Sequence, residues 1–259
     1  MLHSDVRTRI LGVVPARFAS SRFPGKALAL LAGKPMVQHV YERAKMCRYL
    51  SDVLVATDDE RIADAVRRFD GRVRLTLPDH PTGTDRLAEV ASSETASLYV
   101  NIQGDEPLID PEAVDASVLS VLADDEVAMG TLKKRIVEPD EITNPNVVKV
   151  VSNLLNDAIY FSRSPIPFER DAYTGASIYF KHIGVYVYRR DFLLQYPDLK
   201  VGPLEQSERL EQLRALENGY RIRVVETDYE SIGVDTPGDL ERVNRLFVAE
   251  EALVSEKNA

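Results

Sequence analysis

The residues of this chain best suited to chemistry form a basic loop that follows its first apolar run. Arg17, Arg22 and Lys26 lie within ten residues, directly after the strand-like segment Ile10–Val14. A loop that leaves the carboxyl end of a first strand is where an open α/β sheet binds its ligand. Arginine and lysine suit a polyphosphate, because arginine makes forked contacts and lysine supplies a point charge. The loop therefore predicts a phosphate site of a nucleotide-triphosphate enzyme rather than a solvated turn.

Two aspartates follow strand-like runs much further along the chain. Asp105 ends the segment Gln103-Gly104-Asp105, and Asp235 lies just before a predicted final helix. A carboxylate in such a place is the hard oxygen ligand that Mg²⁺ takes when it also binds a substrate's phosphates. Each aspartate could instead cap a helix, and for Asp235 the two interpretations are equally open. Together they predict a two-carboxylate metal site, provided that the fold brings them together.

The segment from His80 to Arg86 combines hydroxyls with the start of a predicted helix. Thr82, Gly83 and Thr84 offer side-chain oxygens and backbone N–H groups that could bind a nucleobase edge or an anion. Thr84 is also the expected N-cap of this helix. Arg86 lies in the first turn, where a cation opposes the helix dipole, so it indicates an acidic ligand.

The sequence lacks the motifs of several other kinds of site. The Gly25-Lys26 pair has neither the upstream glycine nor the downstream Ser or Thr of a Walker loop, and no G-x-G-x-x-G or G-x-S-x-G pattern occurs. None of the four histidines has a partner at metal-ligand spacing, so we expect no zinc site. His182 begins a strand-like segment, where a hydrogen-bonding role is as consistent as a catalytic one.

Composition narrows the class of protein. The 259 residues carry a net charge of −9, which is unfavourable for binding nucleic acid or an anionic membrane surface. Cys47 is the single cysteine, so no intramolecular disulfide or four-thiolate metal site can form. Residues 1–9 lack the apolar core of a signal peptide, and no run approaches the roughly 18 apolar residues of a membrane span. We therefore expect a cytoplasmic protein.

The elements that must position these residues alternate between strands and helices. The predicted strands of the first half are Ile10–Val14, Asp52–Ala56, Val73–Leu77 and Leu98–Gln103, and the predicted helices between them are Pro35–Arg48, Asp59–Phe69 and Thr84–Glu94. Pro35 fits a first helical position, and Asp58 and Asp110 fit N-caps. Such alternation predicts βαβ units and a mostly parallel sheet.

The pattern changes after about residue 126. Strand-like runs at Val127–Lys134, Val147–Ser152, Ile159–Ser162 and Ile183–Tyr188 are joined by polar loops, which predicts a mixed or antiparallel lobe at roughly 130–185. A helix over Pro203–Asn218, a strand at Arg221–Glu226 and a last helix after Pro237 follow. We therefore expect a single α/β domain over residues 1–259, with the lobe inserted in it.

Taken in order, these motifs resemble the 3-deoxy-manno-octulosonate (Kdo) cytidylyltransferases over about residues 9–244. The resemblance is carried by these segments: 15–26, 80–86, 101–107, 144–150, 160–163, 181–186, 210–214 and 233–237. It implies a Rossmann-like nucleotidyltransferase fold of the nucleotide-diphospho-sugar transferase type, with a mostly parallel central sheet. It also implies a homodimer that pairs through the inserted lobe.

The resemblance further implies a role for each matching residue. Arg17, Arg22 and Lys26 would hold the triphosphate of CTP, while Pro15, Ala16, Thr82, Gly83 and Thr84 would contact cytosine and ribose. Asp105 and Asp235 would coordinate Mg²⁺, which makes them catalytic together with Arg17 and Lys26. Arg86, Gln103, Arg163, His182, Tyr186, Glu211 and Gln212 would line the sugar-acid pocket. By helical periodicity alone, Glu211 would point away from the apolar face of its helix, toward solvent as readily as toward a substrate.

The implied reaction is attack of the anomeric hydroxyl of Kdo on the α-phosphorus of CTP, assisted by Mg²⁺, with release of pyrophosphate for lipopolysaccharide synthesis. No residue is evident as a general base, so we expect activation of the hydroxyl by the metal. Alternatives are a cytidylyltransferase for 8-amino-Kdo or sialic acid, a thymidylyl- or uridylyltransferase acting on a sugar phosphate, and a catalytically silent nucleotide-binding dimer. Retention of both aspartates with Arg17 and Lys26 counts against the silent protein.

Overall fold

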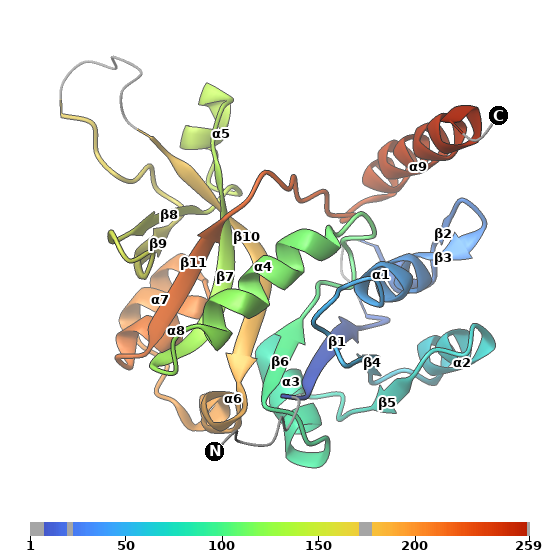
Figure 1. Ribbon diagram of the computed structural model, residues 1–259, viewed down its shortest axis with the longest axis horizontal. Helices are drawn as coiled ribbons and strands as arrows, with labels where there is room; N and C mark the ends of the chain where they lie inside the picture. Colours follow the sequence, from blue (N-terminus) through green and yellow to red (C-terminus); the bar gives the residue numbers. More distant parts are fainter. Residues whose placement is uncertain (1–7, 20–22, 171–177, 258–259) are drawn as a thin grey trace, which may run out of the picture.

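The centre of the molecule is a sheet. The structure, a computed structural model, describes residues 8–19, 23–170 and 178–257, and within them nine strands form this sheet. Its main path runs β11-β7-β10-β6-β1-β4-β5 (Figure 1). These strands are β1 (Ile10–Ala16), β4 (Asp52–Thr57), β5 (Val73–Leu75), β6 (Leu98–Asn101), β7 (Val127–Arg135), β10 (Phe180–Arg189) and β11 (Arg221–Glu226). Arg22 lies outside the described residues.

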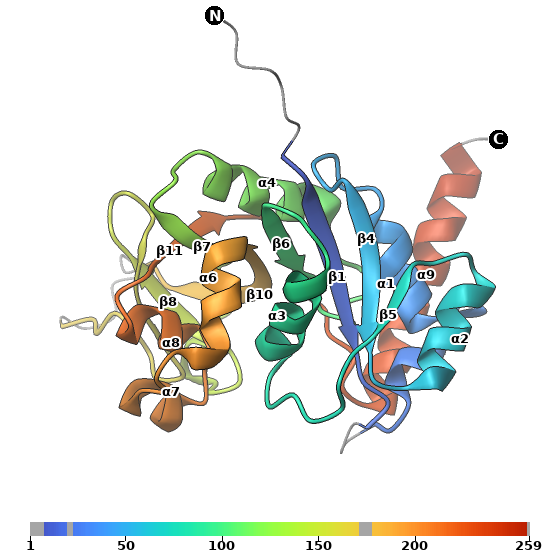
Figure 2. The ribbon, with the colours of Figure 1, turned by 90° about the horizontal axis from the view of Figure 1, so that it is seen from below.

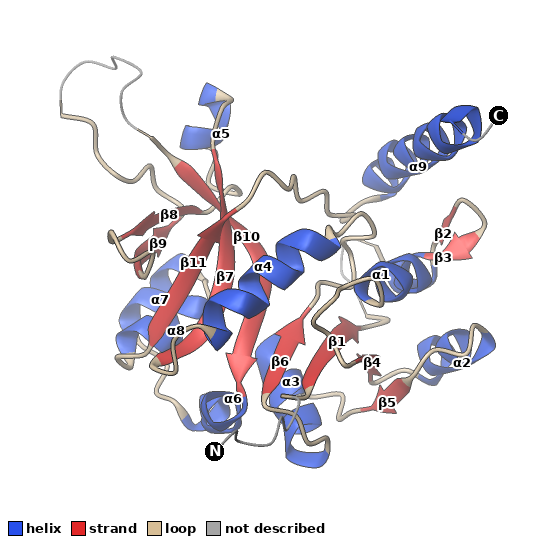
Figure 3. Ribbon diagram, in the orientation of Figure 1, coloured by secondary structure: helices blue, strands red, loops and turns tan. Residues whose placement is uncertain are grey.

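The path is parallel except at β10. Strands β5, β4, β1 and β6 pair in parallel, β10 pairs antiparallel with both β6 and β7, and β11 is again parallel to β7. The segment predicted as a mixed lobe therefore continues the central sheet across the β6–β10 pairing (Figure 3). The expected mostly parallel α/β sheet with an antiparallel portion is confirmed.

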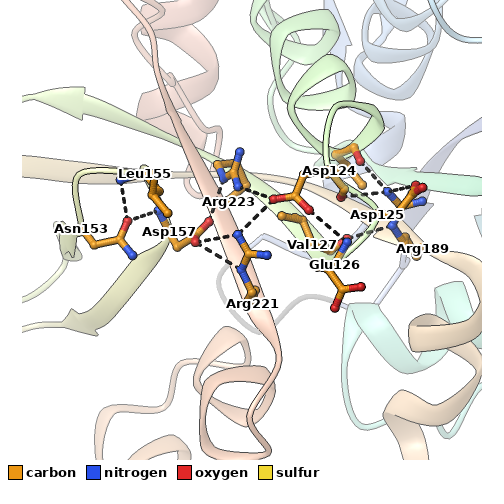
Figure 4. Close-up of polar contacts among 11 residues, drawn as sticks. Asp124, Asp125, Glu126, Val127, Asn153, Leu155, Asp157, Arg189, Arg221 and Arg223 are labelled. Atoms are coloured by element: carbon orange, nitrogen blue, oxygen red, sulfur yellow. Dashed lines mark hydrogen bonds and ion pairs between the residues drawn. The ribbon is translucent and has the colours of Figure 1, made fainter.

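A hairpin is attached to β10, outside the main path of the sheet. It consists of β8 (Lys149–Ser152) and β9 (Ala158–Ser162), and β8 pairs with β10. Asp157, in its turn, binds Arg221 and Arg223 of β11 at 2.9 and 2.7 Å, and Asp124 binds the same two arginines at 3.0 and 2.9 Å (Figure 4). The interleaved charges fasten the hairpin to the central sheet.

Helices cover both faces of the sheet. The helices are α1 (Met36–Ala44), α2 (Glu60–Arg68), α3 (Gly83–Ser93), α4 (Pro111–Leu122), α5 (Pro139–Thr143), α6 (Arg190–Gln195), α7 (Pro203–Glu208), α8 (Gln212–Glu217) and α9 (Pro237–Lys257). One apolar core joins α1, α2 and α4 to the sheet, and a second joins α3, α6 and α8. Figure 2 shows the two groups of helices from below. Strand β1 between them is buried almost throughout, as expected for a parallel strand covered on both faces.

The structure corrects three predicted helix starts. Asp59, not Asp58, caps α2, because its side chain accepts the backbone N–H of Arg61 at 2.9 Å. Thr82, not Thr84, caps α3 in a reciprocal capping box. Pro35 precedes α1 and pairs in the two-residue strand β3 (Lys34–Pro35) with β2 (Leu30–Leu31). Asp110 caps α4 as predicted.

The helix predicted over Pro203–Asn218 is wrong in one respect that matters for the site. It is broken into α7 and α8 at Arg209, whose backbone is left-handed with φ 55° and ψ 47°. A left-handed residue ends α-helical hydrogen bonding, so the chain changes direction before α8 begins. The backbone N–H of Arg209 still donates a hydrogen bond of 2.8 Å to the Glu205 carbonyl of α7.

The last helix, α9, packs on the side of the molecule opposite the hairpin (Figure 1). Val243 and Phe247 bury against Leu31 and Met36 in a small third core. In the described part of the chain, no helix has a stretch long and apolar enough to cross a bilayer.

Candidate active site

Two adjoining cavities open at the carboxyl ends of β1 and β6. We call the larger, of about 650 Å³, the carboxylate cavity, because Asp105 and Asp235 line it. The smaller, of about 250 Å³, is the tyrosine cavity, lined by Tyr186, Tyr188 and Tyr196. The predicted site residues on the wall of the carboxylate cavity are Pro15, Ala16, Arg17, Lys26, Gly83, Gln103, Asp105, Glu211 and Asp235. Those of the tyrosine cavity are Gly83, Thr84, Gln103, Tyr186, Glu211 and Gln212.

The two aspartates meet in the carboxylate cavity, although 130 positions separate them in the sequence. The Lys26 ammonium binds Asp105 at 2.6 Å and Asp235 at 3.2 Å, and it donates to the Val234 carbonyl at 3.2 Å. A backbone hydrogen bond of 2.9 Å from Val234 to Asp105 ties the two segments together. One cation thus reaches both carboxylates at once.

Glycines set the backbone around this cluster. At Gly104 an added Cβ would lie 2.5 Å from the Pro15 carbonyl oxygen, so only glycine allows the β6 loop to approach β1 so closely. Gly25 has φ +70°, and its N–H bonds the Phe18 carbonyl at 2.9 Å. This left-handed turn directs the following residue, Lys26, back across the loop toward Asp105.

Arg17 links the first loop to the start of α3. Its guanidinium donates to the carbonyls of His80 and Thr82 at 2.9 and 3.2 Å. The Thr82 side chain is engaged in the capping box with Asp85, so the predicted contact of its hydroxyl with a ribose would compete with the cap. Thr82 lines neither cavity, but its carbonyl is held by the guanidinium of Arg17, which lines the carboxylate cavity.

Glu211 lies where the two cavities join, because it lines both of them. Its carboxylate accepts the Thr84 hydroxyl at 3.0 Å, and its carbonyl accepts the Tyr196 hydroxyl at 3.1 Å. Burial raises the pKa of Glu211 above its ordinary value. The side chain therefore points inward, and the solvent-facing interpretation is wrong because the helix on which it rested is broken at Arg209.

The tyrosine cavity is lined mainly by neutral hydrogen-bonding groups. Tyr186 approaches Gln212 at 3.4 Å, and Tyr188 approaches Thr84 at 3.3 Å. Within the described residues, the buried Nε2 of Gln212 and Oδ1 of Asn101 have no hydrogen-bond partner. Buried polar atoms without partners are costly, so these two favour a ligand that brings its own donors and acceptors.

Three residues predicted for the sugar pocket lie on neither cavity wall. Arg86 is fully buried and faces Asp58 at 3.4 Å and the Thr76 hydroxyl. Arg163 donates to the carbonyls of Glu208 and Pro145 at 2.7 and 2.9 Å. The Arg163 guanidinium is thus bound by the protein itself. Arg86 keeps two buried guanidinium nitrogens without a hydrogen-bond partner among the described residues, but it lines neither cavity.

His182, the third, lies behind Tyr186. It shares a 2.9 Å hydrogen bond with Thr131, and its ring is 5.0 Å from that of Phe161 and 5.4 Å from that of Tyr186. Burial lowers its pKa to about 3, so the imidazole is neutral at physiological pH. It supports the cavity wall rather than forming it.

Sequence reasoning missed several lining residues. In the tyrosine cavity these are Asn101, Met129, Tyr188, Tyr196, Arg209 and Leu210, and in the carboxylate cavity Ala19, Ala27 and Gly104. Asn101 and Gly104 carried a signal, because both belong to the 101–107 motif that ends a buried strand. Arg209 carried none, since its place depends on a break that helical periodicity does not reveal.

Comparison with known proteins identifies relatives over nearly the whole chain. The family model of the cytidylyltransferases matches residues 11–224. The chain is 66% identical to a 3-deoxy-manno-octulosonate cytidylyltransferase of Solibacter usitatus, covering 93% of this chain and 95% of that protein. It is 57% identical to one of Geobacter metallireducens, covering 91% and 96%.

Solved structures agree. A CMP:2-keto-3-deoxy-manno-octonic acid synthetase complexed with CTP has a TM-score of 0.90 and 45% identity, with 94% of this chain and all of that chain covered. A cytidylyltransferase of Leptospira borgpetersenii has a TM-score of 0.60 at 15% identity, covering 92% of this chain and 85% of that one, and shows the fold alone.

Proposed function

This chain belongs to the 3-deoxy-manno-octulosonate cytidylyltransferase family, and we propose that it transfers CMP from CTP to that sugar acid. The anomeric oxygen of the sugar forms a bond to the α-phosphorus, the bond from that phosphorus to the β-phosphate oxygen breaks, and pyrophosphate leaves while the hydroxyl proton is lost. The observation that carries the proposal is the pair of adjoining cavities, which share Gly83, Gln103 and Glu211. Two substrates bound side by side would meet at this shared wall.

The carboxylate cavity suits the nucleotide. Arg17 and Lys26 supply positive charge toward a triphosphate, and the backbone of Pro15 and Ala16 borders the same space. Lys26 would exchange its contacts with Asp105 and Asp235 for phosphate oxygens when CTP binds. Phosphoryl transfer depends mainly on positioning and charge neutralisation, which these groups provide without a covalent nucleophile.

The two carboxylates fit a magnesium ion. Asp105 and Asp235 already reach one cationic nitrogen together, so their oxygens can share a cation. Across the described residues no group of three or more His, Cys, Asp or Glu side chains could hold a metal. The remaining ligands would be phosphate oxygens and water, as is usual for Mg²⁺. When bound, the ion would neutralise phosphate charge and lower the pKa of a coordinated hydroxyl.

The tyrosine cavity suits a compact molecule rich in hydroxyl groups. Gln212 and Asn101 have the unpartnered atoms described above, and Tyr186, Gln103 and Glu211 add further donors and acceptors. A carboxylate such as Glu211 at the shared wall would accept a hydrogen bond from the sugar and orient it toward the phosphate. His182 and Arg163 would act indirectly, by supporting Tyr186 and the chain at Glu208.

We also propose that the chain acts as a homodimer through the hairpin side of the molecule. Leu154, Leu155, Ile159 and Phe168 are exposed there, and Leu154 is fully so. Asn153 braces the turn by accepting the N–H groups of Leu155 and Asp157, each at 2.9 Å (Figure 4). A second copy would cover this apolar surface.

The dimer is tested by light scattering after gel filtration. The wild type should elute at twice the chain mass, and Leu154→Asp with Leu155→Asp should shift it to the monomer. Leu77→Asp is the matched control, since Leu77 is also exposed but lies far from the hairpin, after β5. A monomeric wild type would overturn the dimer.

The catalytic function is tested by pyrophosphate release from purified protein with Mg²⁺. CTP, UTP, dTTP and ATP are each combined with Kdo, 8-amino-Kdo and sialic acid. Release with CTP and Kdo alone supports the proposal. Release with CTP and another acid would retain the reaction but change the acceptor, and no release in any combination would favour the silent nucleotide-binding protein.

A further inference from the structure

A sugar acid needs a positive charge opposite its carboxylate, and the described wall of the tyrosine cavity contains one cationic side chain, Arg209. The two arginines expected from the sequence to fill this role have other partners. Arg86 is buried against Asp58 and Thr76, and Arg163 is bound to backbone carbonyls. Among the described residues that line this cavity, Glu211 is the one with a carboxylate side chain. The cavity is therefore otherwise neutral or negative, which is unsuited to an acid unless Arg209 takes part.

The Arg209 side chain is available. It is exposed at the edge of the cavity, and among the described residues its guanidinium forms neither an ion pair nor a side-chain hydrogen bond. An arginine without an acidic partner, placed at a cavity, can make a forked contact with a carboxylate. Arg163 differs because its guanidinium is bound to carbonyl groups, and Arg86 differs because it is fully buried and does not line this cavity.

The backbone holds Arg209 in this position at a cost. Its φ of 55° is in the left-handed region that favours glycine, so an arginine there is strained. Hydrogen bonds hold this backbone conformation. The Arg209 N–H donates to the Glu205 carbonyl at 2.8 Å, and the Arg163 guanidinium donates to the carbonyls of Glu208 and Arg209 at 2.7 and 3.5 Å. A turn that needed only to connect α7 with α8 would be better served by glycine.

We propose that Arg209 binds the carboxylate of the acceptor and thereby selects an acidic sugar, with Arg163 as the positioning residue that holds the turn. This inference rests on the proposed function, since it requires a sugar acid in the tyrosine cavity. It assigns the charge selectivity of the acceptor to the α7–α8 turn and the transfer itself to the carboxylate cavity.

The test uses variants that keep the turn. Arg209→Asn and Arg209→Gly both tolerate a left-handed backbone, so both should fold at least as well as the wild type. With CTP saturating, the KM for Kdo should rise about 10- to 100-fold, as expected from loss of a charged hydrogen bond. The kcat and the KM for CTP should change less than about threefold, on the same scale. Arg209→Lys should recover part of the loss.

A second substrate separates a charge effect from a general disturbance of the cavity. The carboxamide of Kdo lacks the negative charge, so the wild type should use it with a KM raised about 10- to 100-fold. Arg209→Asn should lose this discrimination and treat acid and amide alike. Lys200→Asn, which removes an exposed cation that does not line the tyrosine cavity, should leave both KM values unchanged.

The possible failures are distinct. Unchanged KM values for Kdo in Arg209→Asn and Arg209→Gly would overturn the role of Arg209 alone. An equal rise for acid and amide in these variants would show a structural effect and would also overturn it. A wild type that releases pyrophosphate with no sugar acid would overturn the proposed function itself, and the present inference with it.

Discussion

The carboxylate cavity and the tyrosine cavity share a wall but are built from different parts of the sheet. The carboxylate cavity is formed by loops that leave parallel strands, and it gathers Lys26, Asp105 and Asp235 into contact. The tyrosine cavity lies against β10, the one reversed strand of the main path, and is closed by the broken helix at α7 and α8. Parallel strand ends converge on one edge and so concentrate charge there. The reversed strand presents its side chains along its length instead.

This difference separates two kinds of recognition. In the proposed function, phosphates and a metal ion would be bound through full charges, which need not match the shape of the ligand closely. The sugar acid would be bound through many neutral donors and acceptors, such as Tyr186 and Gln212, whose positions must match its hydroxyls. Substitutions in the first cavity should therefore change the rate or the affinity for CTP, and substitutions in the second should change the affinity for the acceptor.

The largest effect is expected at Asp105. Asp105→Asn keeps the backbone bond to Val234 but removes a negative oxygen from the place where a cation would be held. Pyrophosphate release should fall by about a thousandfold or more, since a bound metal supplies several kcal/mol of stabilisation. Steady-state assays of pyrophosphate release over a range of Mg²⁺ concentrations measure this fall.

Asp110→Ala is the matched control. Asp110 caps α4 by accepting the Glu112 N–H at 3.0 Å, so this variant should lose about 1 kcal/mol of stability and keep its activity. Metal-dependent turnover by Asp105→Asn close to that of the wild type would contradict the assignment of Asp105.

Lys26→Met should produce the next largest effect. Without the ammonium group, the KM for CTP should rise about 10- to 100-fold, because a charged hydrogen bond to phosphate is lost. The KM for Kdo should change little, which is what distinguishes the two cavities. Initial rates with each substrate varied in turn give both constants, and a variant in which only the KM for Kdo rises would reverse the assignment of the cavities.

His182 should affect stability in a pH-dependent way. Its folded-state pKa of about 3 lies below the ordinary value of 6.5, so the unfolded chain binds a proton that the folded chain refuses. The contribution of His182 to the free energy of unfolding is therefore complete above pH 6.5 and is lost as the pH falls toward 3. Between pH 7 and pH 5 this group should lower the free energy of unfolding by about 2 kcal/mol.

Urea unfolding at the two pH values measures this loss. In His182→Gln the part of the pH dependence that comes from the imidazole should disappear, whatever the variant's stability at pH 7. If the wild type and His182→Gln lose the same free energy of unfolding between pH 7 and pH 5, His182 is not buried in its neutral form.

Tyr186→Phe should give the smallest effect. The lost hydroxyl makes one long contact, 3.4 Å from Gln212, in a cavity with several other donors. The KM for Kdo should rise only a few-fold, in line with about 1 kcal/mol for a neutral hydrogen bond. Kinetics with Kdo varied at saturating CTP measure the change, and a raised KM for CTP instead would place Tyr186 on the nucleotide side.

Much of the carboxylate cavity could be predicted from local patterns. The run Ile10–Val14 followed by a basic loop, and the Gln103-Gly104-Asp105 segment after another apolar run, indicate ligands at one sheet edge because parallel strands all end there. The strands themselves were predicted to within a few residues, since their apolar runs are short and bounded by turns. The helix caps were less exact, as Asp58 and Asp59 are both acceptable at the start of α2.

The tyrosine cavity could be predicted only in part. Tyr186, Glu211 and Gln212 were expected from the family resemblance, and the structure places all three on its wall. Arg86 and Arg163 were expected there too, but each found a partner distant in sequence, Asp58 or the carbonyl of Glu208. The direction of a long side chain depends on the neighbours that the fold brings to it, and these cannot be predicted from the residue type alone.

The sequence by itself determined the fold class and the place of the basic loop after the first strand, because apolar periodicity and strand-end charges are local properties of the chain. Only the tertiary structure decided that Asp105 and Asp235 share one cation, and that Glu211 faces inward. It also placed Arg209 on the wall of the tyrosine cavity through a left-handed turn, with no ion pair to its guanidinium among the described residues. These features arise from contacts between distant segments, whose energies no local pattern records.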